Sequence, residues 1–423
     1  MSLLLLKRQQ AVLLHFFARL KPTPPVSFGI IPVTAASRHL SSHITRTNTP
    51  GFLQFTNRPV LTMQNITIHT MASEKQVKSE EDKKKKITDW VQPGDNSGEF
   101  KRQVSSFRDW VSREAGAKYP AEKGRYHLYV SYACPWATRA LIARKLKGLE
   151  DIISYSSVHW HLGPNGWRFP TKEEANAEDG EAVIPDPCHP DFTHLRDVYY
   201  ESEPGYAARF TVPVLYDKIQ KRIVNNESSE ILRMMGTEFD DLVEEPYKSV
   251  DLYPEALRKE IDAAHEWQYD LINNGVYKSG FATTQEAYEK NVKALFEALD
   301  RCEEHLKDHH QTADGPFWFG SQLTEVDIRL FVTVIRFDPV YVQHFKCNIR
   351  DIRSGYPAIH QWMRHLYWEI PAFKESTNFE HIKKHYTRSH TQINPHGITP
   401  VGPLPDILPL GEEVPAVAAV ARK

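Results

Sequence analysis

The sequence predicts an α/β domain followed by an all-helical domain. The first observation is a strand–helix–strand pattern between residues 125 and 158, and the second is that only helical patterns occur after residue 254. The chain has 423 residues, of which 41% are apolar, which is enough for two or three domains with ordinary cores. We place the α/β domain at residues 100–240 and the helical domain at residues 254–390.

The α/β domain opens with a β-α-β unit. Residues 125–132 (RYHLYVSY) have the composition of a strand, residues 137–149 have helical periodicity, and residues 152–158 form the second strand. A stretch rich in Pro, Gly and Asp follows at residues 159–209, and we predict it to be irregular. Loops of this length inside a compact domain are usually functional or disordered.

Two short strands and a helix complete this domain. Thr211–Tyr216 and Lys221–Val224 form a predicted hairpin, and residues 225–231 open a helix with side-chain oxygens available for its cap. Before the first strand, Phe100–Gly116 places aromatic residues among polar ones and is expected to dock as an arm. Asp240–Tyr253 is the expected linker to the helical domain.

The second domain reads as helices throughout. Thr324-Glu-Val-Asp327 is similar to a capping box, and we assign it to folding rather than to catalysis. The run from Asn394 is rich in Pro and Gly, so residues 391–423 are expected to form an extended tail. The predicted helices span Pro254–Asn273, Thr284–His309, Thr324–Phe331 and Pro357–Glu369.

The N-terminal segment differs in composition from the rest of the chain. Residues 1–73 contain Lys, Arg, Ser and Thr but no Asp or Glu, which is typical of a mitochondrial transit peptide. The alternative is a disordered or untranslated leader, with Met63 or Met71 starting a shorter cytoplasmic product. Residues 74–99 include a mixed-charge run that is typical of a solvated linker.

Composition excludes several classes of function. The net charge of −2 gives no electrostatic case for binding nucleic acid, and no segment is apolar enough to span a membrane. The cysteines lie too far apart for a disulfide scaffold or a standard zinc spacing. Possible metal ligands gather only in Cys188–His194, which we interpret as a solvated loop, so no metal site is expected. The four cysteines are Cys134, Cys188, Cys302 and Cys347.

Cys134 is the candidate nucleophile. It follows a predicted strand and precedes a predicted helix, in the run Ser131-Tyr-Ala-Cys-Pro-Trp-Ala137. Free backbone N–H groups and the helix dipole favour an anion at that junction, and cysteines at helix N-termini commonly have lowered pKa values. Pro135 suits the first helical turn, where a missing N–H costs little. The alternative is a small buried hydrophobic residue.

The residue three positions after Cys134 defines the kind of thiol chemistry. A second cysteine there would resolve a mixed disulfide internally, but this chain has Ala137. We therefore expect an external thiol to resolve it, and glutathione is the obvious one. The alternative is a distant resolving cysteine, but Cys188 lies in the long loop and Cys302 and Cys347 lie in the helical domain.

Two further motifs favour a peptide ligand that carries both a free ammonium group and a free carboxylate at one end. A cis Val212-Pro213 bond would expose the backbone N–H and C=O of Val212, although most X-Pro bonds are trans. Ser228 can present its hydroxyl and backbone N–H to a carboxylate, and Glu227 can accept from an ammonium group. Ordinary strand and helix-cap roles explain these residues equally well.

These motifs arrive in the order found in glutathione transferases, and the chain resembles their Xi class, the glutathionyl-hydroquinone reductases, from about Trp90 to His390. The resemblance implies a thioredoxin-like glutathione-binding domain, an all-helical domain and a homodimer. It rests on Ser131–Ala137, Gly163-Pro-Asn-Gly-Trp-Arg168, Asn226-Glu-Ser-Ser-Glu-Ile231, Asn274-Gly-Val-Tyr-Lys-Ser-Gly-Phe-Ala282 and Phe337-Asp-Pro-Val-Tyr-Val-Gln-His-Phe-Lys346.

The resemblance also implies a reaction, in which a glutathionyl-hydroquinone and glutathione give hydroquinone and glutathione disulfide through a mixed disulfide on Cys134. The site residues that it implies fall into two groups, with the roles of Arg336 and His344 left open. Glutathione contacts are implied for Trp167, Arg168, Val212, Glu227 and Ser228, and hydroquinone contacts for Tyr277 and Tyr341.

Three alternatives stay open at this point. An omega-like thioltransferase or dehydroascorbate reductase would use Cys134 in the same way, but the insertion at 159–209 and the paired tyrosines favour the hydroquinone reductases. A conjugating transferase would need a hydroxyl where Cys134 stands. A non-catalytic interaction protein with this fold would not need a thiolate.

Overall fold

A four-stranded mixed sheet forms the centre of the first half of the computed structural model, which describes residues 97–175, 182–312 and 315–412. The strand order is β2-β1-β5-β6, with β1 parallel to β2 and antiparallel to β5. Every residue of β1 is buried, as expected for a central strand. The bounds are β1 Tyr126–Val130, β2 Ser154–Ser157, β5 Val214–Asp217 and β6 Arg222–Asn225.

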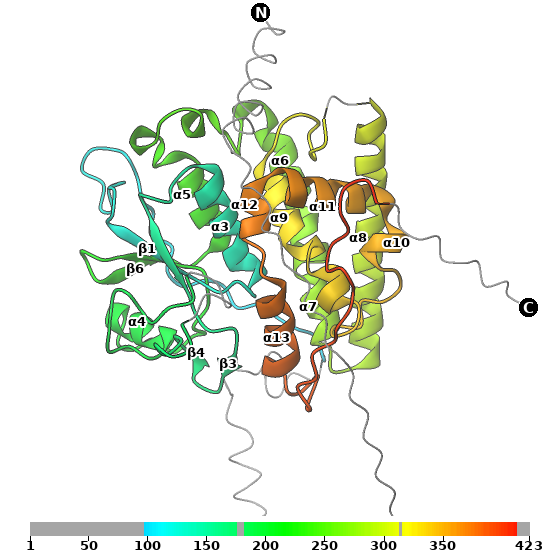
Figure 1. Cartoon of the computed structure of the whole chain (residues 1–423), viewed down its shortest axis with the longest axis horizontal. Helices are drawn as coiled ribbons and strands as arrows, with labels where there is room; N and C mark the ends of the chain where they lie inside the picture. The colour runs from blue at the N-terminus through cyan, green and yellow to red at the C-terminus, as the bar shows by residue number, and fades with distance from the viewer. Residues whose placement is uncertain (1–96, 176–181, 313–314, 413–423) are drawn as a thin grey trace, which may run out of the picture. The chain divides into compact units, whose positions relative to one another are not determined.

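The expected β-α-β opening and the hairpin are both present. Helix α3, Pro135–Leu146, joins β1 to β2, and α5, Ser228–Thr237, follows β6. Figure 1 shows α3 and α5 between the sheet and the helical half of the molecule. Because α3 is covered on both sides, even the polar residues Thr138, Arg139 and Arg144 of this helix are buried.

Part of the segment 159–209 is regular, so the prediction of an irregular stretch is wrong there. It contains a short two-stranded sheet, β3 Leu162–Gly163 and β4 Gly166–Trp167, and the helix α4, Leu195–Ser202. Leu195, Val198 and Tyr199 are buried at helical spacing, and Asp197 accepts a hydrogen bond from the backbone of His194 at 3.0 Å. The helix α4 was not predicted because its apolar periodicity covers only two turns and lies among turn-forming residues.

The segment Cys188–His194 is also less solvated than its composition suggests. The His189 Nδ1 lies 2.8 Å from Asp186, and its Nε2 lies 2.9 Å from the hydroxyl of Tyr216 on β5. Asp186 is itself buried and accepts from Tyr129 at 2.9 Å. The segment is therefore packed against the sheet. Among the residues that the structure describes, no group of three or more His, Cys, Asp or Glu side chains could hold a metal ion.

The second half contains helices without strands in the part of the chain described. Four predicted helices correspond to α6, α8, α9 and α11, whereas α7, α10, α12 and α13 were not predicted, most of them because they are too short for a periodic pattern. None of the described helices is long and apolar enough to cross a membrane. The bounds are α6 Arg258–Gln268, α7 Gly275–Gly280, α8 Gln285–Thr312, α9 Glu325–Val334, α10 Ile352–Gly355, α11 Pro357–Glu369, α12 Pro371–Glu375 and α13 Phe379–Ser389.

Short helical turns connect these elements. The linker predicted at residues 240–253 contains two 3-10 turns, and two π-helical turns extend α6 and follow α9. The 3-10 turns are η1 Asp240–Leu242, η2 Tyr247–Ser249 and η3 Glu255–Leu257, and the π-helical turns are η4 Tyr269–Asn273 and η5 Phe337–Tyr341.

Both ends of the described chain are packed onto this core. In the arm before β1, Phe100, Phe107 and Val111 are buried, and the Asp109 N–H donates to Val224 of β6 at 3.1 Å, which confirms docking. The C-terminal segment has no helix or strand as far as residue 412, but the Trp368 indole donates to its Leu408 carbonyl at 2.9 Å. Residues 1–73 lie outside the described residues, so the targeting prediction remains untested.

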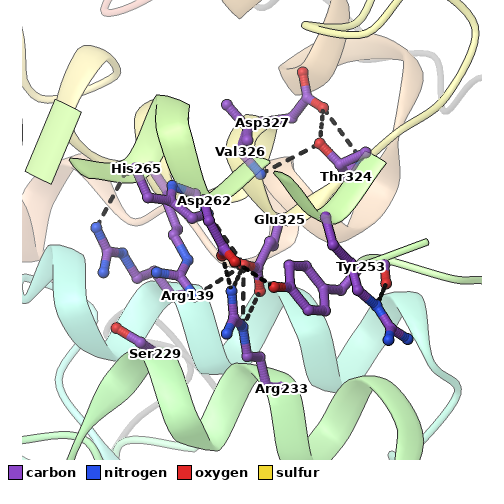
Figure 2. Close-up of polar contacts among 12 residues, drawn as sticks. Arg139, Ser229, Arg233, Tyr253, Asp262, His265, Thr324, Glu325, Val326 and Asp327 are labelled. Carbon is purple, nitrogen blue, oxygen red and sulfur yellow. Dashed lines mark hydrogen bonds and ion pairs between the residues drawn. The ribbon is translucent and has the colours of Figure 1, made fainter. Parts of the chain in front are cut away.

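The predicted capping box is present at the start of α9. The Thr324 hydroxyl accepts from the Val326 N–H at 3.3 Å, and Asp327 accepts from the Thr324 N–H at 3.0 Å (Figure 2). Asp327 is fully buried and also accepts from the Trp318 N–H and the Trp362 indole, at 2.8 and 3.0 Å. One carboxylate thus joins α9, α11 and the preceding loop.

We expect Asp327→Ala to destabilise the protein by at least about 2 kcal/mol, because it leaves three buried N–H donors without an acceptor. Asp327→Asn keeps an acceptor of the same shape and should lose less than Asp327→Ala. Chemical unfolding of the two variants and the wild type measures the difference. Equal losses in both variants would contradict the role of the carboxylate as an acceptor.

A buried ionic cluster around Glu325 joins the two halves. Arg233 of α5 donates to Glu325 at 2.8 Å, His265 of α6 donates at 3.1 Å, and Arg329 pairs with it at 3.1 Å (Figure 2). Burial acts to raise the pKa of Glu325, but His265 and the two arginines lower it to about 2. Burial lowers the pKa of His265 to about 4, so it donates as a neutral imidazole at pH 7. The cluster holds α5 in place beside the helical half.

Candidate active site

The Cys134 thiol lies where the sequence places it, at the N-cap of α3, directly after β1. The Cys134 N–H donates to the Ser131 carbonyl at 3.0 Å, and the Cys134 carbonyl accepts from the N–H and the hydroxyl of Thr138, both at 3.0 Å. The sulfur lies 3.6 Å from the Val212 carbonyl oxygen, and the Val212–Pro213 bond is cis as predicted. The thiol therefore faces a backbone position that can hold an extended peptide.

Burial and the groups around the Cys134 thiol shift its pKa in opposite directions. Burial raises the pKa of the thiol, and this effect outweighs the backbone N–H groups of Ala137 and Trp136 and the charges of Arg336 and Arg102, all of which lower it. The sequence left the pKa of this thiol open and indicated only that a helix N-terminus favours the thiolate; in the structure, burial outweighs that preference. The backbone N–H groups at the start of α3 do lower the pKa of the thiol, as a helix N-terminus is expected to do.

A pH dependence follows from this setting. A raised pKa means that the reactive thiolate is present only above the ordinary range of a cysteine thiol and is lost as the pH falls through the raised value. We expect the rate of iodoacetamide alkylation at Cys134 to keep rising with pH beyond the point where a model thiol levels off. Peptide-resolved mass spectrometry across pH measures this rate. A profile below that of the model thiol would contradict the dominance of burial.

Arg336 holds the backbone that carries the thiol. It is completely buried, and its guanidinium donates to the carbonyls of Tyr132 and Ala133 at 3.0 and 3.2 Å. It also donates to the Thr138 hydroxyl at 2.8 Å and to the Val332 carbonyl of α9 at 2.7 Å. Sequence reasoning left the role of Arg336 open, and the structure makes it the link between the helical half and the Cys134 loop.

Three buried tyrosines form a hydroxyl cluster near the thiol. The Tyr386 hydroxyl lies 2.7 Å from that of Tyr277 and 3.1 Å from that of Tyr341. Burial raises the pKa of Tyr277, and the charge of the Cys134 thiolate raises it further, so the two groups are close. The two predicted tyrosines are thus brought together. Tyr386 was missed because α13 was not recognised as an element.

Local backbone features bring these rings together. Tyr341 ends the π-helical turn η5, and such turns are frequent at functional sites. Its ring stacks on Phe345 with centroids 5.4 Å apart. Gly280, the last residue of α7, has no room for a side chain, because an added Cβ would lie 2.0 Å from the Phe345 ring. The glycine allows α7, with Tyr277, to approach η5.

Histidines from α13 and its neighbours lie behind this cluster. His344 Nε2 lies 3.2 Å from His390 Nδ1, and burial lowers the pKa of His344 to about 4, so it is neutral at pH 7. His385 stacks on Trp167, with ring centroids 4.9 Å apart. Helix α13 therefore contacts both the β3–β4 segment and the tyrosine cluster, and Figure 1 shows this helix between β3 and the helical half.

The remaining predicted glutathione contacts have partners within the protein. Arg168 forms a bidentate ion pair with Glu174, at 2.6 and 2.8 Å, directly after Trp167. Glu227 caps α5 by accepting from the Ser229 N–H at 3.2 Å, and it also accepts from Ser105 of the arm at 2.9 Å. Ser228 is the first residue of that helix. The structure places Glu227 and Ser228 together at the start of α5, whereas Trp167 ends β4 and Arg168 follows it.

The partly buried ring of Trp136 joins these parts. It follows Cys134 in α3, and the guanidinium groups of Arg139 and Arg102 lie over its ring, with the Cζ atoms 4.6 and 4.4 Å from the centroid. Arg139 Nη1 lies 3.5 Å from the Ser228 hydroxyl. Sequence reasoning did not single out Arg102 or Trp136 as site residues, because their contacts come from distant segments.

A thioredoxin-like sheet with a single cysteine at the first helix, a cis-proline opposite it and a helical second half define the class of glutathione transferases. Two protein-family models match the chain and support this class. The model described as "Glutathione S-transferase, N-terminal domain" matches residues 133–238, and that described as "Glutathione S-transferase, C-terminal domain" matches residues 285–365.

Individual relatives indicate which class of glutathione transferase the chain resembles. Glutathione S-transferase omega-like 2 of Schizosaccharomyces pombe is 55% identical over 76% of this chain and 97% of its own length. Glutathionyl-hydroquinone reductase YqjG of Escherichia coli is 46% identical over 75% of this chain and 93% of its own. The crystal structure of the Xi transferase of Phanerochaete chrysosporium superposes with a TM-score of 0.69 at 57% identity, covering 75% of this chain and 96% of that one.

The chain belongs to the Xi class of glutathione transferases, the family of the glutathionyl-hydroquinone reductases. The structure of YqjG from Escherichia coli was solved with glutathione bound, and it superposes with a TM-score of 0.64 at 45% identity, covering 70% of this chain and 92% of that one.

Proposed function

We propose that this protein reduces glutathionyl-hydroquinones with glutathione, releasing hydroquinone and glutathione disulfide. The observation that carries the proposal is the single thiol of Cys134 beside the hydroxyl cluster of Tyr277, Tyr386 and Tyr341. The thiol has no partner cysteine at Ala137, and the hydroxyls suit a phenolic ring. Membership of the Xi class supports the same reaction.

The glutathione part of the substrate fits the face formed by α3, α5 and the cis-proline. The Val212 backbone would pair with the cysteinyl unit, and Ser228 and Glu227 would take the carboxylate and ammonium of the γ-glutamyl end. Trp167 would pack against the peptide. Arg168 would act through its ion pair with Glu174, which holds the segment directly after Trp167 in place.

The reaction proceeds in two displacements at sulfur. The Cys134 thiolate attacks the sulfur of the conjugate, the carbon–sulfur bond breaks, and its electron pair passes into the ketonised ring, which leaves as a phenolate and takes a proton. Cys134 is then joined to glutathione by a disulfide. A second glutathione thiolate attacks the glutathione sulfur of that disulfide, releasing glutathione disulfide and the Cys134 thiolate. The ring carbon gains two electrons, and the thioether sulfur of the conjugate and the thiol sulfur of the second glutathione each lose one as they form the disulfide, so the electrons balance.

The alternative, an omega-like thioltransferase, shares the second displacement but needs no hydroxyl cluster. A test therefore compares two substrates, a glutathionyl-hydroquinone and the mixed disulfide of glutathione with 2-mercaptoethanol. The proposal expects efficient release of hydroquinone. Turnover of the mixed disulfide alone would overturn it in favour of the thioltransferase.

The covalent intermediate gives an independent test. Incubation with glutathione disulfide should add one glutathione to the intact protein, and peptide mapping should place it on Cys134. Cys302 and Cys347 are buried and should not react, whereas the partly exposed Cys188 is the internal control. An adduct on Cys188 alone would contradict the proposed mechanism.

We expect Tyr386→Phe to lower kcat for the glutathionyl-hydroquinone roughly tenfold, which corresponds to about 1.4 kcal/mol of transition-state stabilisation. The change keeps the ring but removes the hydroxyl that holds those of Tyr277 and Tyr341 together. Reduction of the mixed disulfide should be unchanged. Tyr200→Phe, at an exposed position, is the matched control. Equal losses on both substrates would show that Tyr386 acts only in folding.

We further propose that the protein is a homodimer, as its resemblance to the Xi class implies. Size-exclusion chromatography with light scattering should give about twice the chain mass of 48.8 kDa. A monomeric mass for active protein would contradict this.

A further inference from the structure

The arm before β1 carries a charged residue to the reaction centre. The Cζ of Arg102 lies 4.4 Å from the centroid of the Trp136 ring and 4.8 Å from that of Tyr277. Trp136 is two residues after Cys134, and Tyr277 belongs to the hydroxyl cluster. The charge of Arg102 acts to lower the pKa of both Cys134 and Tyr277, against the effect of burial. The guanidinium thus lies close to both groups.

One buried guanidinium nitrogen of Arg102 is available for a ligand. Its Nε donates to Asn274, the residue before α7, at 2.5 Å. Its Nη2 is buried and has no hydrogen-bond partner among residues 97–175, 182–312 and 315–412. A buried charged donor without an acceptor costs more free energy than a neutral one. A bound ligand with a negatively charged oxygen would satisfy it.

The same arm also reaches the opposite end of the site. Ser105, three residues after Arg102, donates to Glu227 at 2.9 Å, and Glu227 is the proposed partner of the γ-glutamyl ammonium. The arm lies before residue 133, where the match to the N-terminal family domain begins. It therefore adds contacts to both the glutathione side and the phenol side of the site.

We propose that Arg102 is a substrate-binding residue whose free N–H donor takes an anionic oxygen of the bound glutathionyl conjugate. This inference rests on the proposed function. Two anionic groups of the conjugate would belong to the two sides of the site that the arm reaches, the γ-glutamyl carboxylate on the Glu227 side and, on the Tyr277 side, the phenolate that forms when the carbon–sulfur bond breaks. Both are acceptors for a guanidinium, which binds them more strongly than a neutral donor does.

The test uses Arg102→Gln and Arg102→Lys in the full chain, with Lys101→Gln as the control at the neighbouring exposed position. We expect Arg102→Gln to lower kcat/KM for the glutathionyl-hydroquinone by roughly tenfold or more. Arg102→Lys keeps the charge and should recover part of the loss, and Lys101→Gln should behave as the wild type. Thermal unfolding confirms that the variants are folded.

Two substrates distinguish the two oxygens. If Arg102 binds the phenolate, Arg102→Gln lowers only the hydroquinone reaction. If it binds the carboxylate, KM for glutathione also rises in reduction of the mixed disulfide. If both reactions stay within about twofold of the wild type, the proposal is overturned.

The pH profile of Cys134 alkylation supplies a readout that a merely structural residue would not move. Loss of the Arg102 charge should shift the profile to higher pH in Arg102→Gln but not in Arg102→Lys. Arg336 and Tyr277 also face the thiol, and neither changes in these variants. An unmoved profile would overturn the placement of Arg102 at the thiol. This readout needs no hydroquinone, so it stands even if wild-type protein fails to release one.

Discussion

Replacing Cys134 with Ser is expected to abolish release of hydroquinone from its glutathionyl conjugate, with a fall in kcat of at least roughly 10³-fold. The variant keeps the size and the hydrogen-bonding ability of the side chain at the N-cap of α3, so the fold should be unaffected. An alcohol at this position cannot form the mixed disulfide. Steady-state release of hydroquinone, followed by chromatography, measures the effect.

The matched control for this variant is Cys188→Ser. Cys188 is also partly exposed, but it lies in the segment packed against the sheet, where its N–H donates to Asp186 at 2.8 Å. Its replacement should leave kcat within about twofold of the wild type. Substantial turnover by Cys134→Ser, or its loss in Cys188→Ser, would show that the displacement runs through another thiol.

The second large effect is expected at Arg336. Arg336→Met keeps much of the volume of the side chain but removes all donors to Tyr132, Ala133, Thr138 and Val332. Because three of these acceptors are buried backbone carbonyls, we expect a loss of about 3–5 kcal/mol in the free energy of unfolding. Urea unfolding of the variant and the wild type measures it.

The same substitution should also affect the thiol. Without the guanidinium, the loop before Cys134 loses its tie to α9, and the charge that opposes burial at the sulfur is lost. The alkylation profile of Cys134 should therefore shift to higher pH. Arg113→Ala, at an exposed arginine, should change stability by less than about 0.5 kcal/mol. If Arg336→Met unfolds at the same urea concentration as the wild type, the proposed link between the two halves is wrong.

The parts of the fold that could be predicted are those encoded by short-range patterns. The central strand, α3, the hairpin and α11 each have a periodicity or a boundary residue in their own segment. The capping box at Thr324 and Asp327 was predicted for the same reason, since its hydrogen bonds join residues three apart. Helices α4 and α13 were missed, because one is two turns long and the other adjoins a Pro- and Gly-rich tail.

The residues of the candidate site likewise fall into those that local sequence patterns could predict and those that they could not. Cys134, Val212, Glu227 and Ser228 stand at element boundaries that are visible in the sequence, so their chemistry could be inferred. Tyr386 and Arg102 could not be inferred, because their contacts depend on how α13 and the arm pack against α7. The resemblance to a family identified Tyr277 and Tyr341, but not the hydroxyl that joins them.

The sequence by itself determined that this protein has a cysteine at a strand-to-helix junction and no second cysteine three residues further on, because Cys134 and Ala137 lie in one short motif. Only the tertiary structure decided which side chains fix the loop before Cys134 and in which direction the pKa of its thiol is shifted. Arg336 reaches Ala133 across 203 residues of chain, and Arg102 reaches Asn274 across 172. The burial of the sulfur and the charges around it depend on many residues that are distant in the sequence. A short sequence pattern therefore cannot predict them.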